Sequence, residues 1–150
     1  MVDVVDSATR SRMMSGIGGR NTKPELLLRS ALHRRGFRFR LHVPDLPGKP
    51  DIVFPKRRAV IFVHGCFWHG HECPRFKWPQ TRADFWRQKI SRNRQNDEKA
   101  VTSLQADGWR VAVVWECSLR GKKQKIESTV KVVSDWLCSN DRMMEHPTAV

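Results

Sequence analysis

The sequence has no tyrosine, few acidic residues and no long apolar run. Asp and Glu together number 15 against 28 Lys and Arg. Its apolar runs, such as residues 111–115, are far shorter than the roughly 20 residues that a membrane-spanning helix needs. The start of the chain, residues 1–6, is acidic and does not have the pattern of a signal peptide. We therefore expect no membrane segment.

The charge balance indicates a polyanionic partner. The formal net charge is +13 and the isoelectric point is near 10.5. Basic side chains displace condensed counterions from a phosphate backbone, so this excess favours nucleic acid. Arginine outnumbers lysine, and its planar guanidinium suits bidentate phosphate contacts. The alternative is a basic protein whose charge serves solubility alone.

The order of predicted elements indicates a single mixed α/β domain over residues 1–150. The expected elements are, in order, a capped helix over 22–35, a strand over 37–41, a hairpin of strands 51–54 and 59–64, a long helix capped by 81–84 and ending near 106, a strand over 109–115 and a helix over 128–137. This order predicts a central mixed sheet flanked by helices. We expect residues 1–21 to form an N-terminal arm that contacts the nucleic acid, and residues 139–150 to form a flexible tail.

A loop at residues 64–73 crowds five potential metal ligands into ten residues, and a cysteine at a strand end adds a sixth. Structural zinc takes four Cys or His ligands in a closed tetrahedron. The set that would pin this loop to the sheet is Cys66, His71, Cys73 and Cys117. Because the loop has few aliphatic residues, a metal is a sensible substitute for packing. The alternative is a loop of Cys and His without metal.

Two histidines of this loop and the fourth cysteine of the chain have other expected roles. His64 and His69 are left free for chemistry once the four zinc ligands are assigned. Cys138 stands apart near the C-terminus, and its position predicts a core residue on the face of the last helix.

A carboxylate opens the predicted hairpin, in the sequence Pro50-Asp51. Nucleases of the PD-(D/E)xK type place such an Asp on a hairpin to bind Mg²⁺, with an acid and a Lys on the next strand. Here Phe62 and His64 stand at those two positions, on one face of the strand. Mg²⁺ tolerates a single carboxylate because it keeps several waters and uses phosphate oxygens. The alternative for Asp51 is an ordinary turn residue after proline.

Several motifs together resemble the very-short-patch repair (Vsr) endonuclease family. The matching segments are residues 8–11, 46–51, 60–69, 81–86 and 108–117. The Phe-Trp-His sequence at 67–69 and the Trp-Glu-Cys sequence at 115–117 are specific in combination. The resemblance covers about residues 3–120.

The resemblance implies a DNA mismatch endonuclease with a PD-(D/E)xK restriction-endonuclease-like core and a zinc-stapled loop. Its reaction would be hydrolysis of the phosphodiester 5′ to the T of a T·G pair, which arises when 5-methylcytosine deaminates. Asp51 would bind Mg²⁺, with the main-chain carbonyl of Val63 as a second ligand. His69 would activate water, supported by Glu25, and His64 would contact the scissile phosphate.

One of these residues, Val63, departs from the family pattern, and another, Glu25, has an alternative role. Val63 stands where the family often has Thr, a change without effect if only the carbonyl coordinates. Glu25 also fits the capping box of the first helix as the partner of Thr22.

Aromatic residues resemble the family's intercalating side chains. Phe67, Trp68 and Trp86 are the expected wedge, and Met14 would press from the opposite groove, because a T·G pair distorts more easily than a matched pair. The alternative is packing, with Phe67 and Trp68 on the zinc loop and Trp86 in the core. Basic residues that flank these rings are candidates for phosphate contacts, and the alternative for each of them is a solvated surface charge: Arg75, Lys77, Arg82, Arg87, Lys89, Arg92 and Arg94.

The resemblance also implies partners and a location. The expected partner is double-stranded DNA with a T·G mismatch, with mismatch-repair proteins and a repair polymerase as further candidates. We expect a monomer in the bacterial cytoplasm, associated with the nucleoid. Two rival functions are a zinc-containing DNA-binding module without catalysis and a restriction-type endonuclease that cuts intact duplex.

Overall fold

The computed structural model describes residues 22–71, 73 and 77–147. The predicted N-terminal arm, and with it Met14, lies outside the described residues, as does Arg75. Within the described part no helix is both long and apolar enough to cross a membrane.

A five-stranded sheet forms the centre of the domain, in the order β1-β2-β3-β4-β5. The strands are β1 (Arg40–Leu41), β2 (Ile52–Phe54), β3 (Ala59–His64), β4 (Arg110–Trp115) and β5 (Met143–His146). β1, β2 and β3 pair antiparallel, whereas β3, β4 and β5 pair parallel. β2 and β3 form the predicted hairpin, closed by the 3₁₀ helix η1 (Pro55–Arg57) and by Arg58 in the left-handed conformation.

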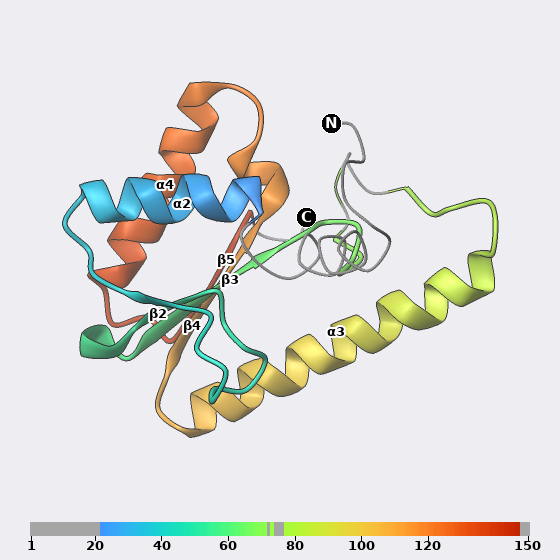
Figure 1. Cartoon of the computed structure of the whole chain (residues 1–150), viewed down its shortest axis with the longest axis horizontal. Coiled ribbons are helices and arrows are strands. Elements are labelled where there is room, and N and C mark those ends of the chain that lie inside the picture. Colours follow the sequence, from blue (N-terminus) through green and yellow to red (C-terminus); the bar gives the residue numbers. More distant parts are fainter. Residues whose placement is uncertain (1–21, 72, 74–76, 148–150) are drawn as a thin grey trace, which may run out of the picture.

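Three helices cover both faces of this sheet. The helices are α2 (Lys23–Arg34), α3 (Ala83–Ala106) and α4 (Lys123–Leu137). Figure 1 shows α2 and α4 on one side of the sheet and α3 on the other, with one end of α3 projecting away from the domain. The predicted mixed α/β fold with a sheet flanked by helices is therefore confirmed.

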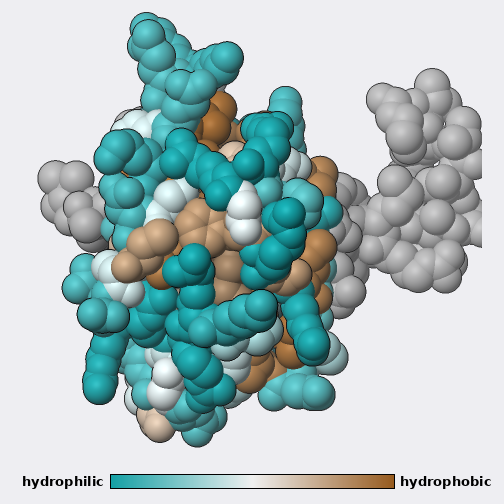
Figure 2. Space-filling model, turned by 90° about the vertical axis from the view of Figure 1, so that its left-hand side faces the viewer, coloured by the Kyte–Doolittle hydropathy of each residue, from teal (hydrophilic) through white to brown (hydrophobic). Residues whose placement is uncertain are grey.

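The core divides accordingly into two layers. Buried residues of α2 and α4, such as Leu28, Leu32 and Val133, pack on one face of the sheet. Ala100 and Leu104 of α3 pack on the other. Figure 2 shows that the surface on the left-hand side of Figure 1 is mainly hydrophilic around a smaller apolar area.

Local sequence explains how two segments reach the site. The hydroxyl of Thr22 accepts a hydrogen bond from the Glu25 N–H at 3.4 Å, so the predicted cap of α2 is confirmed. The turn before Asp51 lies against α3 at Gly48, where an added β-carbon would stand 2.5 Å from the Cβ of Ala100. Glycine is therefore required there, and its φ of +73° is readily adopted only by glycine.

Four sequence expectations about these elements were wrong. The flexible tail is wrong for residues 143–146, because β5 completes the backbone hydrogen bonds of β4. Cys138 does not face the core: it is exposed, because it follows the last residue of α4 as its C-cap. α4 begins at Lys123 rather than 128. α3 has no side-chain cap, since Arg82, with φ of 58°, occupies the N-cap position.

Candidate active site and metal centre

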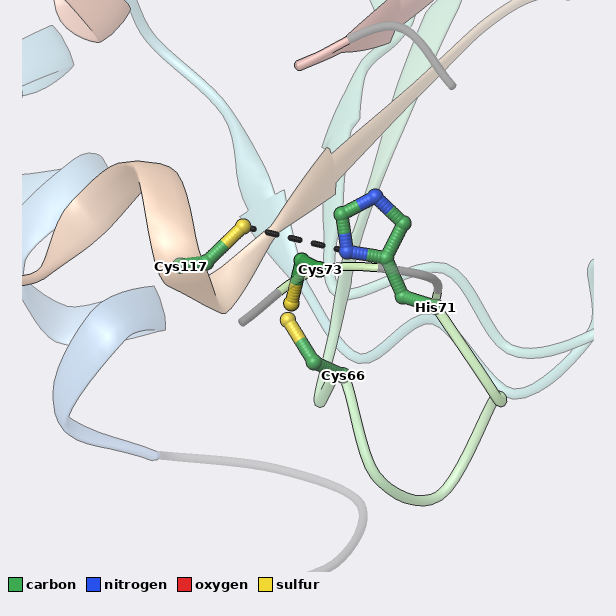
Figure 3. Close-up of side chains that lie close together, drawn as sticks. All are labelled: Cys66, His71, Cys73 and Cys117. Atoms are coloured by element: carbon green, nitrogen blue, oxygen red, sulfur yellow. Dashed lines mark hydrogen bonds between the residues drawn. The ribbon is translucent and has the colours of Figure 1, made fainter. Parts of the chain in front are cut away.

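The four residues predicted to bind zinc lie together, and we call them the cysteine cluster: Cys66, His71, Cys73 and Cys117. One ligand atom from each lies within 4.8 Å of all the others. Three come from the loop after β3 and one from the 3₁₀ helix η2 (Glu116–Leu119) after β4. Figure 3 shows the four side chains pointing toward one another, with the Sγ of Cys117 3.8 Å from the Nδ1 of His71.

The surroundings of the cysteine cluster fit a zinc ion. Burial raises the pKa values of the Cys66 and Cys117 thiols, so without a cation these groups hold their protons. Zinc binds the thiolate form and removes that penalty. The His71 ring stacks on Trp115, with centroids 4.2 Å apart and planes within 5°. The stack fixes the direction of the imidazole, as zinc ligation requires.

A second group, the carboxylate cluster, consists of Glu25, His42 and Asp51. α2 supplies Glu25, the segment after β1 supplies His42, and Asp51 directly precedes β2. The Oε2 of Glu25 lies 3.1 Å from His42 Nε2, and Asp51 Oδ1 lies 4.0 Å from His42 Nδ1. Glu25 and Asp51 are both buried, so two carboxylates share a poorly solvated space.

The electrostatics of Asp51 follow from this placement. Burial raises its pKa to about 8, and the nearby Glu25 adds to the rise, although a hydrogen bond from the Val63 N–H opposes it. That hydrogen bond measures 2.7 Å from the nitrogen to Asp51 Oδ2. A carboxyl group that burial makes reluctant to ionise is one that a bound cation would stabilise in its charged form.

A third group, the histidine cluster, consists of His64, His69 and Asp97. The Nδ1 of His69 lies 2.5 Å from Asp97 Oδ2, and the Nε2 of His64 lies 3.9 Å from Asp97 Oδ1. The two imidazole rings stack with centroids 3.9 Å apart. Burial and the neighbouring His69 lower the pKa of His64, and its buried Nδ1 has no hydrogen-bond partner among the described residues. His64 is therefore a neutral ring beside His69.

A cavity of about 290 Å³ brings Asp51 of the carboxylate cluster together with the histidine cluster. Its lining includes Asp51, Val63, His64, His69 and Asp97. Phe62, which stands where PD-(D/E)xK nucleases have an acid, lines the same cavity. The second acidic side chain of the cavity thus comes from α3 rather than from β3.

Sequence reasoning missed Asp97 and His42 and assigned one contact wrongly. The carboxylate at the His69 Nδ1 is Asp97, not Glu25, which instead accepts from Arg29 at 2.8 Å and lies beside His42. Glu25 lies in the first turn of α2, and its carboxylate is within 4.8 Å of that of Asp51. The sequence does give one sign of a role for Asp97: it is an acidic residue that follows, by about one helical turn, a strongly basic stretch of the long helix.

The three predicted wedge residues lie together. The ring centroids of Phe67, Trp68 and Trp86 lie 5.3 to 5.8 Å apart, and Phe85 contacts Trp86 at 5.2 Å. Trp86 is not in the core: it is half-buried, and its ring contacts those of Phe67 and Trp68 in the loop. Trp68 and Phe85 are exposed by 38% and 41%, so this aromatic cluster is open to a ligand.

Four of the basic residues around the aromatic cluster fall into two groups. The Lys89 Nζ lies within 6 Å of three of the rings, and the Arg82 guanidinium lies 4.2 Å from the Phe85 centroid. Lys77 is exposed. These three side chains remain candidates for phosphate contacts. Arg94 is engaged otherwise, since it donates to the backbone carbonyls of His69 and Gly70.

Comparison with known proteins identifies the family of this chain. Residues 2–75 match the family model described as DNA mismatch endonuclease Vsr. The chain is 46% identical to the DNA mismatch endonuclease Vsr of Escherichia coli over 92% of its own length and 89% of the relative's. It is 53% identical to a type II nicking enzyme, V.XorIIP, of Xanthomonas oryzae, over 79% of its length and 88% of that enzyme's. It is 41% identical to the type II nicking enzyme V.NmeAIP of Neisseria meningitidis, over 90% and 99%. The chain therefore belongs to the Vsr family of DNA mismatch endonucleases.

Proposed function

We propose that this protein nicks one strand of duplex DNA at the phosphodiester 5′ to the T of a T·G mismatch. The observation that carries the proposal is that Asp51 and the His69–Asp97 pair line one cavity. His69 lies on the loop that also bears Phe67 and Trp68. Relatives named as a mismatch endonuclease and as nicking enzymes support the same reaction. The net charge of +13 supports a DNA substrate.

We assign magnesium to Asp51 and the main-chain carbonyl of Val63. The N–H of Val63 donates to Asp51, and in a strand the N–H and C=O of one residue point to the same side. The carbonyl therefore also faces Asp51. A magnesium ion there would neutralise charge on the phosphate and lower the pKa of a bound water.

His69 has the surroundings of a general base. A carboxylate accepts hydrogen bonds and does not donate them, so Asp97 holds the proton of His69 on Nδ1 and leaves the lone pair on Nε2. In hydrolysis, His69 takes a proton from water as the water oxygen bonds to phosphorus and the P–O bond of the leaving strand breaks.

Glu25 and His64 have supporting roles in this proposal. Glu25 lies in the carboxylate cluster, where its charge adds to the attraction for a cation at Asp51. The burial of His64 and its stack on His69 support a role in holding the His69 ring. Its contact with the scissile phosphate stays a prediction.

The aromatic cluster is the proposed mismatch reader. Its exposed rings suit insertion beside a base pair that unstacks at low cost, and Lys89 and Arg82 lie where a phosphate backbone would pass. Lys77 and Arg75 would extend these phosphate contacts. Met14 is the proposed contact from the other groove.

The remaining assignments concern the second metal and the cellular setting. We assign zinc, in a structural role, to the cysteine cluster, which has the Cys₃His ligand set of such sites. Mismatch-repair proteins and a repair polymerase are the proposed partners of a monomer that works on bacterial nucleoid DNA.

A nicking assay tests the proposed function. Duplexes that differ only in T·G versus C·G at one position, within varied flanking sequence, are incubated with the protein and Mg²⁺. We expect a nick 5′ to the T that matched DNA and EDTA both abolish. Tight binding without a nick would support the non-catalytic DNA-binding module, and equal cutting of matched duplex would support the restriction-type endonuclease.

A further inference from the structure

α3 holds three successive carbonyls of the loop that carries His69. The Asn93 side-chain amide donates to the Trp68 carbonyl at 2.8 Å. The Arg94 Nε donates to the His69 carbonyl at 3.2 Å, and its Nη2 donates to the Gly70 carbonyl. The same helix therefore binds residues 68–70, the segment that links the aromatic cluster to His71 of the cysteine cluster.

These donors lie on the same face of α3 as Asp97. Positions three and four residues apart are neighbours on a helix surface, and Asn93 and Arg94 precede Asp97 by four and three residues. The face thus contacts His69 twice: Arg94 binds its backbone carbonyl and Asp97 binds its imidazole. With both contacts in place, the backbone and the ring of His69 are fixed relative to one rigid element.

Gly70 makes room for this arrangement. Its φ is +64°, and an added β-carbon would lie 2.6 Å from the Cγ2 of Ile90 and 2.8 Å from the Nε of Arg94. Ile90 is a buried side chain, so it has little freedom to move aside. Any other residue at position 70 would push the loop away from α3 or displace the Arg94 guanidinium.

We propose that Arg94 is a positioning residue for His69, and that Gly70 is the residue that lets Arg94 reach the loop. The proposal rests on the proposed function, because the consequence of a displaced His69 is a slower nick. Arg94 then acts on the loop and not on a DNA phosphate. Holding the loop by backbone carbonyls ties the position of the wedge residue Trp68 to that of the general base.

The expected consequence is a loss of rate rather than of fold. A displacement of about 1 Å at a catalytic group can cost on the order of 100-fold in rate. Arg94 is exposed, so its removal leaves the packed core and the cysteine cluster intact. Lys99, another exposed cation on α3, gives a control with the same loss of charge.

The test compares Arg94→Ala, Gly70→Ala, their double variant and Lys99→Ala. We expect Arg94→Ala to nick a T·G duplex at saturating enzyme about tenfold or more slowly than Lys99→Ala, with the two variants binding DNA equally well. Gly70→Ala should show a similar loss, and the double variant should be no slower than the slower single variant, because both changes break the same contact.

Three results would overturn the proposal: Arg94→Ala nicking as fast as Lys99→Ala, additive losses in the double variant, or a collapse of the Arg94→Ala melting temperature. NMR resonances of the His69 ring give a second measure without catalysis. Arg94→Ala should shift them and Lys99→Ala should not. If the wild-type protein nicks no duplex, the proposed function fails, while unshifted His69 resonances in Arg94→Ala would refute the positioning role separately.

Discussion

The cysteine cluster and the histidine cluster share one loop but differ in how they are closed. In the first, four ligands from two segments surround one point, which leaves no position for a substrate. In the second, His69 and Asp97 have side chains 18% and 27% exposed, and they line a cavity shared with Asp51. Structural zinc sites are closed, whereas sites that perform chemistry keep open positions. We therefore propose that one cluster stabilises the loop and that the other carries out hydrolysis.

The largest effect should come from removing the charge of the open site. Asp51→Asn keeps an oxygen for the Val63 N–H but loses the carboxylate that we assign to magnesium. We expect nicking to fall about 1,000-fold or more, because the metal-activated water is lost. Single-turnover assays with Mg²⁺ measure the rate, and zinc content and DNA affinity should stay at wild-type values. Loss of zinc together with activity would contradict the separation of the two clusters.

Removing one residue of the cysteine cluster should lower the free energy of unfolding. Cys117→Ser removes the proposed zinc ligand from η2, so the variant should retain less zinc and lose about 3 kcal/mol or more of unfolding free energy. Denaturant melts and metal analysis by mass spectrometry measure both quantities. Cys138→Ser, at an exposed cysteine outside the cluster, is the matched control. Equal melting and zinc content in the two variants would refute the zinc assignment.

The two clusters also differ in how far sequence could predict them. Three of the four residues of the cysteine cluster lie within eight positions, and such a density of Cys and His in a short loop is typical of a metal site. Asp97 and His42 are single polar residues on a helix and a loop, and only tertiary packing brings them to His69 and Asp51. The sequence analysis also missed β5, because a four-residue edge strand has too short a pattern of its own and becomes recognisable only from its pairing with β4.

The next effect follows from the partner of His69, which is Asp97 and not the predicted Glu25. Asp97→Asn places an amide at the His69 Nδ1, so the tautomer is no longer fixed. We expect the nicking rate to fall on the order of 100-fold, with unchanged zinc content. Glu98→Gln, on the next and exposed position of α3, should nick close to the wild-type rate. An Asp97→Asn rate equal to that of Glu98→Gln would remove Asp97 from the site.

The raised pKa of Asp51 predicts a pH dependence of stability that the closed site does not share. Between its unfolded pKa of 3.8 and its folded pKa of about 8, the folded chain keeps a proton that the unfolded chain releases. Stability therefore falls as pH rises through this window. Without Mg²⁺, Asp51→Asn should be more stable than wild type at pH 8 by about 1 to 3 kcal/mol. This difference should shrink toward pH 4, and a difference independent of pH would contradict the account.

The smallest effect concerns recognition. Trp68→Ala removes an exposed ring of the aromatic cluster, and stacking contributes about 1 to 3 kcal/mol per base. We expect the preference for T·G over C·G duplex to fall about tenfold, with less change in affinity for matched DNA. Competition binding with the two duplexes measures the preference. Equal losses on both duplexes would show that the ring only packs the loop.

Brief chelation is the most direct test that the cysteine cluster has a structural role and the open site a catalytic one. The protein is treated with EDTA for a time too short to extract zinc from a closed site, and its zinc content and nicking are measured before and after Mg²⁺ is restored. We predict one zinc per chain throughout, no nicking in EDTA and full nicking once Mg²⁺ returns. Nicking that persists in EDTA, or that returns only when zinc is supplied, would contradict the assignment of structure to the cysteine cluster and chemistry to the open site.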